Sequence, residues 1–488
     1  MQLNMDDIDL AIVLGLHHKN QQRSGIALWN ISLLGIAFFF IYTSYGTSMF
    51  IEKPTVASVN GEYREEWGGK DWNAYELLGV NYAIYALFGW ISPSLINFLG
   101  LRRAMIVHGL VLSLAGLVYI FPFYYGLMVS SIALGVGQAV LWTAQGNLLT
   151  INSRDETIMR NSGIFWVIYQ TSLLVGNIIV YHRFEDRRTI DRYTRNVTFT
   201  CLTVCSLVGV LALFALKEPE SDSPQSTTHN GPWKILCSTL NLVKSKKMIL
   251  LFLAFIYTGL EGTFFSGVYD ASVAFSKHRS NLTPKRFSGI SGALTGAGEI
   301  AGGFLVILFG SAKKRKQNNF LIFLGYCIHI ITFAVMYFNL QFHVSLNGSD
   351  EPDIVHTRYS NYDSKICKRV LIMIVFPFSL ILALICSFLI GFGDACYQNQ
   401  INAFLGSVYR AESSPPFAIC VFFQNLSSAI AFYYSKHIPL DTHIYILTIV
   451  GTIGTLAFFA SDHLNKVEKR VTHYKKKIIK VIQSSQTR

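Results

Sequence analysis

The chain has 488 residues, of which 51% are hydrophobic and only 14% are charged. A soluble protein carries about 25% charged residues, so this composition excludes an ordinary soluble domain and indicates a multi-pass membrane protein. The net charge of +12 does not require nucleic acid as a partner, because basic residues of membrane proteins gather in cytoplasmic loops and beside anionic headgroups. The partner that we expect from composition is the lipid bilayer.

Twelve stretches are long and apolar enough to cross a bilayer as α-helices, each of which needs about 20 mostly apolar residues. In chain order the predicted spans are 26–50, 76–99, 104–123, 127–150, 163–181, 197–216, 248–270, 288–310, 320–340, 376–405, 416–434 and 443–460. The segment before the first span has acidic residues where a secretory signal peptide has positive charges, so we expect no signal peptide.

The even number of spans puts both termini on one side of the membrane, and we expect that side to be the cytoplasm. Arg102 and Arg103, the basic run 313–316 and the C-terminal tail all fall in inner segments of this orientation. Three glycosylation sequons fall in its outer loops, at Asn196, Asn281 and Asn347. We expect the protein in the plasma membrane or an endolysosomal membrane.

A polar segment rich in serine and proline, 217–232, divides the spans into two sets of six, because it cannot bury a core. The predicted parts are a cytoplasmic N-terminus, an N-terminal six-helix half, a cytoplasmic linker, a C-terminal six-helix half and a basic amphipathic cytoplasmic tail. Their bounds are 1–25, 26–216, 217–247, 248–460 and 461–488.

Short motifs recur at matching positions in the two sets. Gly135-x-Gly137-Gln138 in the fourth span matches Gly391-x-Gly393-Asp394 in the tenth. "IYTSYGT" in the first span likewise matches "IYTGLEGT" in the seventh. A parallel repeat of six spans predicts the major facilitator superfamily fold, with 12 transmembrane helices in two parallel six-helix halves. Substrate sites of that fold lie near mid-membrane between the halves.

Three further motifs carry a family resemblance. "ISPS" at Ile91, "WTAQGNLLT" at Trp142 and "RNSGIFW" at Arg160 resemble the uncoordinated-93 family of major-facilitator-like membrane proteins. The resemblance covers all twelve spans and implies a twelve-helix fold with cytoplasmic termini. The better-understood relatives act as accessory subunits or escorts of other membrane proteins, among them a potassium channel and innate immune receptors.

One departure from ordinary facilitators concerns the charges that help to gate the inner side. The usual motif Gly-x-x-x-Asp-Arg-x-Gly-Arg-Arg/Lys lies between spans 2 and 3, and Asn97 stands here where its Asp would be. In the second half, Ile307 occupies that position. The missing acids favour an accessory protein over a transporter with ordinary alternating access.

Three acids lie near the centres of predicted spans, namely Glu261, Glu299 and Asp394. A charge at the bilayer centre costs about 3 kcal/mol, and no Lys or Arg lies deep in any predicted span. We therefore expect these acids to carry protons. They either couple a proton or cation to function, or are neutral acids hydrogen-bonded to neighbouring helices. For Glu261, which precedes Gly262, an expected helix break favours the functional alternative.

Amide side chains form a second candidate site. Gln138 and Gln145 are seven residues apart and share one helix face, and Gln170 and Asn177 repeat that spacing in the fifth span. The two faces either contact each other or both line a central cavity. Interhelical polar bonds in membranes average about 0.6 kcal/mol, so packing alone can explain one such pair.

Span 8 carries the small-xxx-small pairs Gly292/Gly296 and Gly298/Gly302, which permit close helix packing. Glu299 lies within this glycine-rich face, so we expect it to face another helix rather than lipid. The inner loop 152–161 carries four charged residues that we expect to form a solvated ion-pair cluster: Arg154, Asp155, Glu156 and Arg160.

The tail has apolar residues alternately three and four apart, with basic residues over much of the remaining surface. The apolar positions are Leu464, Val467, Val471, Tyr474, Ile478 and Val481. This pattern predicts a basic amphipathic helix on the inner leaflet, with a short coiled coil as the alternative.

We expect no enzyme activity, no cofactor and no metal site, because the sequence has no Walker motif, no His/Glu zinc pair and no Cys/His metal spacing. Two functions stay open. The resemblance and the missing gating acids favour an accessory subunit or escort of a membrane channel or receptor. The repeat and the central acids favour a proton-coupled or facilitative transporter of a small solute.

Overall fold

The computed structural model describes residues 5–183, 190–217, 231–270, 272, 284–310, 318–339, 380–410, 414–435 and 438–486. The first half of the chain forms α1 (Met5–Tyr63), α2 (Ala74–Gly89), α3 (Ser92–Leu99), α4 (Leu101–Ala115), η1 (Gly116–Tyr119), α5 (Tyr124–Ile151), α6 (Ile158–Arg183) and α7 (Arg192–Leu213). The second half forms α9 (Lys246–Thr263), η2 (Phe264–Tyr269), α11 (Pro284–Gly310), α12 (Asn318–Asn339), α14 (Leu380–Val408), α15 (Ser414–Ser435) and α16 (Leu440–Gln486). One more helix, α8 (Pro232–Val243), lies within the predicted linker.

The regular secondary structure of the described residues is entirely helical. Eleven of the described helices are long and apolar enough to cross a membrane, and the number rises to twelve if the bent pair α2–α3 counts as one span. The predicted all-α, multi-pass membrane fold is confirmed.

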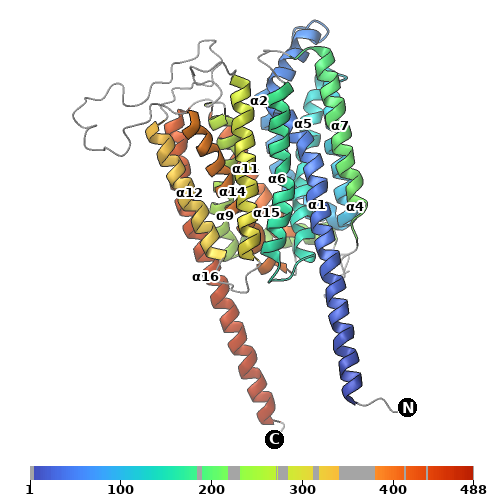
Figure 1. Cartoon of the computed structure of the whole chain (residues 1–488), viewed down its shortest axis with the longest axis vertical. Coiled ribbons are helices and arrows are strands. Elements are labelled where there is room, and N and C mark those ends of the chain that lie inside the picture. The colour runs from blue at the N-terminus through green and yellow to red at the C-terminus, as the bar shows by residue number, and fades with distance from the viewer. Residues whose placement is uncertain are drawn as a thin grey trace, which may run out of the picture.

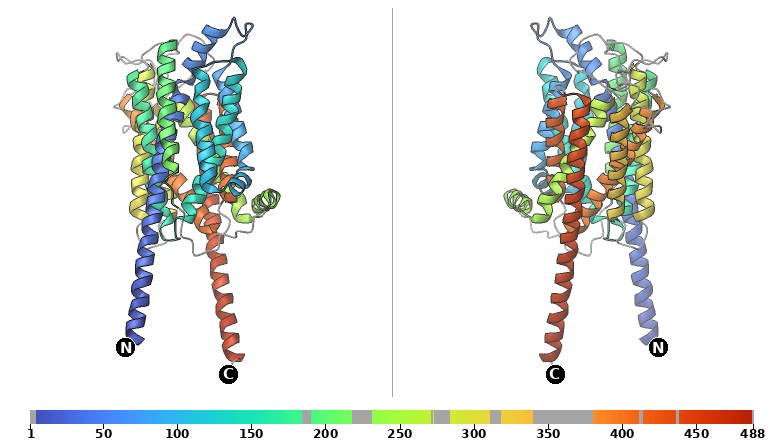
Figure 2. Two further views of the ribbon diagram at one scale, coloured as in Figure 1. Left: turned by 90° about the vertical axis from the view of Figure 1, so that its right-hand side faces the viewer. Right: turned by 90° about the vertical axis from the view of Figure 1, so that its left-hand side faces the viewer.

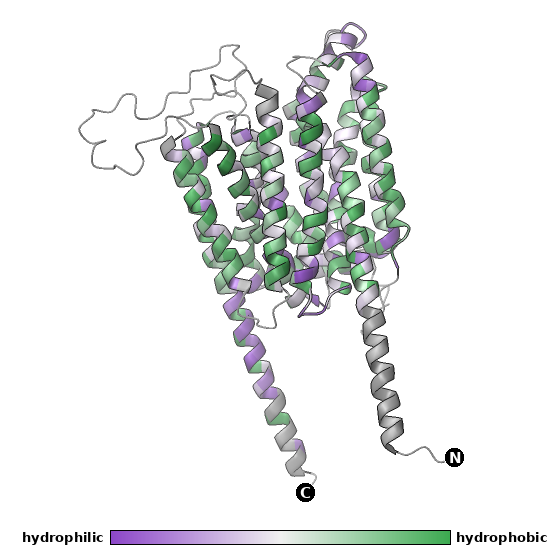
Figure 3. Ribbon diagram, viewed as in Figure 1, coloured by the Kyte–Doolittle hydropathy of each residue, from purple (hydrophilic) through white to green (hydrophobic). Residues whose placement is uncertain are grey.

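The two halves form two helix bundles that stand side by side (Figure 1). α1 begins and α16 ends on the same side of the molecule, as an even number of spans requires (Figures 1 and 2). We call this end, where α5 ends at Ile151 and α14 ends at Val408, the termini side, and the opposite end the far side. Apolar residues dominate the bundle, whereas the part of α16 that projects from the termini side is mostly polar (Figure 3).

The predicted repeat is visible in the helix contacts. A Cβ added at Gly135 of α5 would lie 2.6 Å from a backbone oxygen of α2, and one added at Gly391 of α14 would lie 2.1 Å from a backbone oxygen of α11. Gly137 and Gly393, two residues further on, lie in the same way against α4 and α12. The fourth span of each half therefore packs closely on the second and third spans of that half.

The halves contact each other through α6 with α11 and through α2 with α15. α11 carries two glycine faces, as the small-xxx-small pairs predict. Gly292 and Gly296 lie against α6 of the other half, whereas Gly298 and Gly302 lie against α14 of the same half. The absence of side chains at these positions lets three helix backbones approach one another closely.

The second predicted span differs from the expected straight helix. α2 and α3 are bent by 65° at their junction. Pro93 stands in the first turn of α3, where its missing N–H costs nothing, but its ring is incompatible with an unbroken helix running in from α2. The sequence "ISPS" at Ile91 therefore marks a break in the span.

The first helix is longer than predicted. α1 continues to Tyr63, beyond the expected end of its span at residue 50. Ile51, Val56 and Val59 pack into one apolar cluster with Leu77 of α2, which explains why the helix persists on the far side.

The last helix includes the predicted amphipathic tail. α16 runs without a break from the final span into the tail, which projects from the bundle (Figure 1), and its position on the inner leaflet stays a prediction. Ser461 donates to the Lys247 carbonyl at 3.0 Å, and the Lys247 ammonium lies 2.6 Å from the Glu468 carboxylate. These contacts fasten the start of the tail to α9 and keep the helix straight.

An ion pair between a buried arginine and a partly exposed glutamate joins α1 to α7 on the far side. The guanidinium of Arg195 is fully buried and contacts the Glu62 carboxylate through two hydrogen bonds of 2.7 and 2.9 Å. It also donates to the Tyr119 carbonyl and to the Ser58 hydroxyl, both at 2.9 Å. The charge is therefore paired and its donors are used, which is what a buried guanidinium requires.

Candidate central site between the halves

The three acids predicted from the sequence lie close together in the second half. Glu261 is on α9, Glu299 is on α11 and Asp394 is on α14, and all three are at least 95% buried. Asp394 lies close enough to both glutamates for the carboxyls to interact electrostatically. No Lys or Arg of the described chain is paired with any of them. The cluster therefore concentrates acid in an apolar interior without a cationic partner.

Glu299 connects the cluster to the first half. The indole N–H of Trp166, on α6, donates to its Oε2 at 2.8 Å. Its Oε1 is buried and has no hydrogen-bond partner among the described residues. The prediction that Glu299 faces another helix is confirmed, and the bond places this acid at the contact between the halves.

Glu261 lies next to a buried histidine. The Nε2 of His329, on α12, is 3.8 Å from Oε1 of Glu261. The same nitrogen lies 3.1 Å from the Ile390 carbonyl, to which it can only donate, and Nδ1 lies 2.6 Å from the Tyr257 hydroxyl. In a neutral ring the proton therefore sits on Nε2, and Nδ1 accepts from Tyr257. A second proton on Nδ1 would leave a cation beside Glu261.

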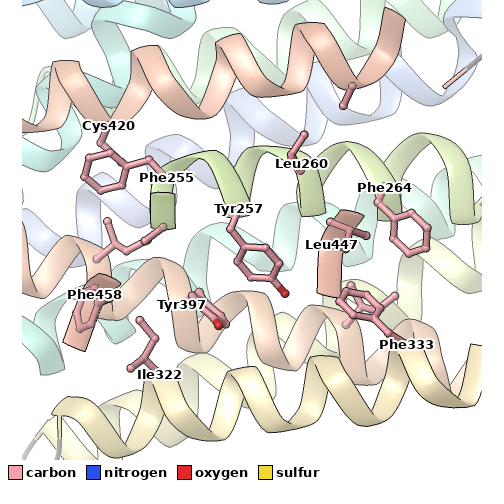
Figure 4. Packing of buried hydrophobic residues seen from close by; sticks show 14 of the residues in the cluster. Phe255, Tyr257, Leu260, Phe264, Ile322, Phe333, Tyr397, Cys420, Leu447 and Phe458 are labelled. Atoms are coloured by element: carbon pink, nitrogen blue, oxygen red, sulfur yellow. The ribbon is translucent and has the colours of Figure 1, made fainter. Parts of the chain in front are cut away.

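Aromatic packing holds this group in position. Tyr257 projects from α9 toward Tyr397 of α14, with 5.1 Å between the ring centroids (Figure 4). The His329 ring stacks on Tyr397 at 5.6 Å. Directly after α9, the span continues as the six-residue π-helix η2, a helix irregularity that is common at functional sites. The break expected at Gly262 is therefore not found, because the span runs on through Gly262 and only changes its helix type after Thr263.

Asp394 is linked to α15 by two amide side chains. Gln398 donates to Asp394 Oδ1 at 3.2 Å, and Gln424 donates to Gln398 Oε1 at 3.1 Å and to the Thr258 hydroxyl at 2.8 Å. Gln398 and Gln424 remain partly exposed. The polar network therefore runs from the buried acids to side chains that a small molecule can reach.

Aromatic side chains of the first half lie opposite the acids. Tyr42, Trp142 and Tyr169 pack edge to face, with ring centroids 5.3–5.6 Å apart. Tyr169 also packs on Trp166 at 5.6 Å, and its hydroxyl lies within electrostatic range of Glu299 and Asp394. The site thus has an aromatic side on the first half and an acidic side on the second.

The predicted amides do not form one site. Gln138 donates to Asn81 of α2 at 3.1 Å, and Asn177 lies against Gly292 of α11. The two amide faces therefore do not contact each other, although α5 and α6 touch through Trp142 and Tyr169. The alternative, that both faces line a central cavity, stays a prediction. The side chains of Gln145 on α5 and Gln170 on α6 are both buried.

The charged loop of the termini side joins the halves instead of forming only a solvated cluster. Nη2 of Arg410, at the end of α14, lies 2.9 Å from Oδ1 of Asp155 in the loop before α6. Arg410 also donates to the carbonyl oxygens of Thr150 and Ser153. An ionic contact between the halves therefore exists here, although Asn97 and Ile307 replace the acids of the usual motif.

The glycosylation sequons stay a prediction. Asn196 lies in the first turns of α7, half-buried, and its Oδ1 has no hydrogen-bond partner in the described part of the chain. Asn281 and Asn347 lie outside the described residues. A metal site is not indicated, since no group of three His, Cys, Asp or Glu side chains in the described ranges is arranged to hold an ion.

Comparison with known proteins decides the family. The family model described as "Ion channel regulatory protein UNC-93" matches residues 70–459. The chain belongs to the UNC-93 family. UNC93-like protein MFSD11 of Xenopus tropicalis is 34% identical over 449 residues, which cover 88% of this chain and 95% of that protein. Protein unc-93 homolog A of Homo sapiens is 23% identical, over 88% of this chain and 92% of its own. The resemblance inferred from three short motifs is confirmed.

The UNC-93 chain has the fold of the major facilitator superfamily, as predicted. The solved structure of the transporter FucP in the outward conformation matches it with a TM-score of 0.61, over 88% of this chain and 98% of that one. The two sequences are 11% identical, so the likeness shows the fold alone.

The sequence of this UNC-93 protein predicted the buried acids but not three side chains that contact these acids or join the halves. Trp166 lies within the family motif "RNSGIFW" and could have been singled out there. His329 stands alone in an apolar stretch, which is a usable signal for a buried polar group. Arg410 has no sequence signal of its own, because its role depends on Asp155, 255 residues away.

Proposed function

We propose that this protein is a regulatory or escort subunit of another membrane protein, an ion channel or a receptor. We place both termini in the cytoplasm, and the protein in the plasma membrane or an endolysosomal membrane. The description of its family, which names ion channel regulation, supports a regulatory role. The observation that carries the proposal in this chain is the projecting part of α16.

This part of α16 exposes an apolar stripe. Val467, Val471, Tyr474 and Ile478 are 40–65% exposed, and their spacing of three and four residues puts them on one helix face. A helix face of this kind is stabilised by packing on another helix. Basic residues flank the stripe, and they favour a partner helix with acidic flanks over a second copy of the same tail.

The test is co-purification from native membranes, read for one dominant channel or receptor, with two matched variants of the tail. Val471→Asp puts a charge into the stripe, whereas Thr472→Asp adds the same charge on the neighbouring, polar face. We expect the first variant to lose the partner and the second to keep it. A chain that is isolated as a monomer from native tissue, or variants that behave alike, would contradict the proposal.

The central site supports a second candidate function, proton-linked movement of a small solute. Glu261, Glu299, Asp394 and His329 form a group in which a proton can be held at several positions, and Trp166 links that group to the other half. A change of protonation would therefore act directly on a contact between the halves.

Uptake into proteoliposomes tests this second function. Glu299→Gln keeps the size and the bond from Trp166 but removes the titratable proton, and we expect it to abolish the pH dependence of uptake without lowering the amount of protein that is reconstituted. Glu299→Asp, which keeps a titratable carboxyl at this position, is the conservative control. Unchanged pH dependence in both Glu299→Gln and Asp394→Asn would exclude coupling through these acids.

A further inference from the structure

The side chains between the halves have a chemistry that selects for positive charge. On the first half, the side chains of Trp142 on α5 and Tyr169 on α6 are partly exposed. Trp142 packs on Tyr42 and Tyr169 and belongs to an apolar cluster with Val421 of α15. Both rings also pack on Trp166, whose indole donates to Glu299 at 2.8 Å, so they lie beside the acids at the contact between the halves.

Two buried acids lie beside these aromatic rings. Glu299 and Asp394 lie within electrostatic range of the Tyr169 hydroxyl, and Oε1 of Glu299 is fully buried without a partner among the described residues. The titratable groups packed around them are Glu261, His329, Cys396 and tyrosines, and none of these supplies a permanent positive charge. An anion placed here would meet only acids and the negative faces of aromatic rings, which disfavour it.

We propose that the group formed by Trp142, Tyr169 and the carboxyls of Glu299 and Asp394 binds a small organic cation, an alkylated or quaternary ammonium. The aromatic faces attract the cationic head, as aromatic cages do, and a carboxylate supplies the opposite charge. An inorganic ion fits less well, since the described His, Cys, Asp and Glu side chains form no coordination group. The proposal deepens the second proposed function, because it names the class of solute.

The protonation of the site follows from this chemistry. In the empty site a carboxyl carries a proton, because a bare charge in an apolar interior is costly. When an ammonium ion enters, the O–H bond of one carboxyl breaks, the proton leaves to bulk water, and the carboxylate pairs with the cation. Charge balances, with one positive charge entering and one leaving.

The test is direct binding to the purified full-length protein, followed by intrinsic tryptophan fluorescence. The probes are tetramethylammonium, choline and tetraethylammonium, with 3,3-dimethylbutan-1-ol as the control, since it has the shape of choline and a carbon in place of the charged nitrogen. We expect a saturable change with at least one cation and none with the alcohol. The proposal is overturned if no cation gives a saturable change, or if the alcohol binds as well as choline.

Variants locate the site, with their binding measured by isothermal titration calorimetry because each variant removes a fluorescent tryptophan. Trp142→Leu should weaken cation binding about tenfold or more, whereas Trp142→Phe, which keeps an aromatic face, should retain most of it. Trp233→Leu removes an exposed tryptophan of α8 and should leave binding unchanged. Equal affinity of Trp142→Leu, Trp142→Phe and the wild type would overturn the proposed position, and loss in Trp142→Leu alone supports it whether or not that variant is less stable.

The outcomes separate this inference from the proposed functions. Binding without uptake into proteoliposomes retains the cation site and contradicts the transporter. Absence of binding removes the cation site, while the regulatory function is decided by co-purification with a partner and by the paired variants of the tail.

Discussion

Removing the guanidinium of Arg410 should loosen the contact between the halves on the termini side. Arg410 lies at the end of α14 and reaches across to the loop before α6, where Nη2 and Nε lie 2.9 and 3.2 Å from Asp155 Oδ1. Nη1 donates to the Thr150 carbonyl at 3.4 Å and also to the Ser153 carbonyl. Arg410→Ala deletes all of these bonds, whereas Asp155→Asn removes only the ion pair.

The exposure of the two side chains sets the magnitudes. They are 37% and 43% exposed, so the ion pair itself is worth about 0.2–1 kcal/mol. The bonds from the charged guanidinium to backbone oxygens add more, because a hydrogen bond to a charged group contributes about 1.5–3 kcal/mol and partial exposure favours the lower end of that range. We therefore expect about 2–3 kcal/mol for Arg410→Ala, or about 30- to 150-fold in the population of separated halves, and less than about 5-fold for Asp155→Asn.

The assay uses a cysteine in place of a buried side chain between the halves. Ser162 of α6 is fully buried and donates to Asn399 of α14 at 2.7 Å. The maleimide labelling rate of Ser162→Cys, corrected for labelling of native cysteines in the parent protein, should follow the population in which the halves separate. The control is Arg102→Ala, since Arg102 donates to the Phe214 carbonyl within one half.

The reasoning is refuted if Arg410→Ala leaves the labelling rate unchanged, or if Arg102→Ala raises it by as much. An effect of Asp155→Asn as large as that of Arg410→Ala would show that the ion pair, and not the bonds to the backbone, holds the halves together.

Three further predictions concern stability and pH. Glu62→Gln leaves the buried charge of Arg195 without a counterion and should lower the free energy of unfolding by about 2–3 kcal/mol. This is below the roughly 3–5 kcal/mol expected for a fully buried pair, because the Glu62 side chain is 30% exposed. Thermal unfolding in detergent measures the loss of stability, and an unchanged midpoint contradicts the prediction. Gly298→Ala puts a Cβ 2.0 Å from a backbone oxygen of α14, so it should destabilise by about 1–3 kcal/mol, whereas Gly61→Ala, with nothing within 4 Å, should be neutral or stabilising. Affinity for choline should fall as the pH is lowered, because a protonated Glu299 cannot pair with a cation, and titrations that do not depend on pH would exclude that pairing.

The fold could be predicted because its determinants are continuous in the sequence. Each span is one apolar stretch, and Gly135, Gly137, Gly391 and Gly393 mark contacts that are made within each half. The predictions that failed depended on what a helix meets in space. The amide faces of the fourth and fifth spans were expected either to contact each other or to line a cavity, yet Gln138 bonds to α2. The two helices do touch, but through Trp142 and Tyr169, because packing decides which face of a helix meets a neighbour.

The candidate site was predicted in part for a similar reason. An acid in an apolar stretch is conspicuous, so Glu261, Glu299 and Asp394 could be found from the sequence. The Trp166 side chain could not be assigned to Glu299, since tryptophan is common in membrane spans and only the contact of α6 with α11 brings the two together. The role of Arg410 likewise depends on a loop of the other half.

The unbroken course of α16 couples the last membrane span to the apolar stripe of the tail. Since a single helix contains both, a rotation of the span about its axis turns the stripe through the same angle, and a partner bound to the tail resists that rotation. Insertion of one alanine after Arg470 would rotate the part of the stripe that follows by about 100° around the helix axis and move it about 1.5 Å along that axis. Insertion of seven alanines would restore almost the original orientation, about 10 Å further along the axis. The tail therefore fixes both the orientation of the apolar stripe and its distance from the last span, and with them where a partner helix can bind.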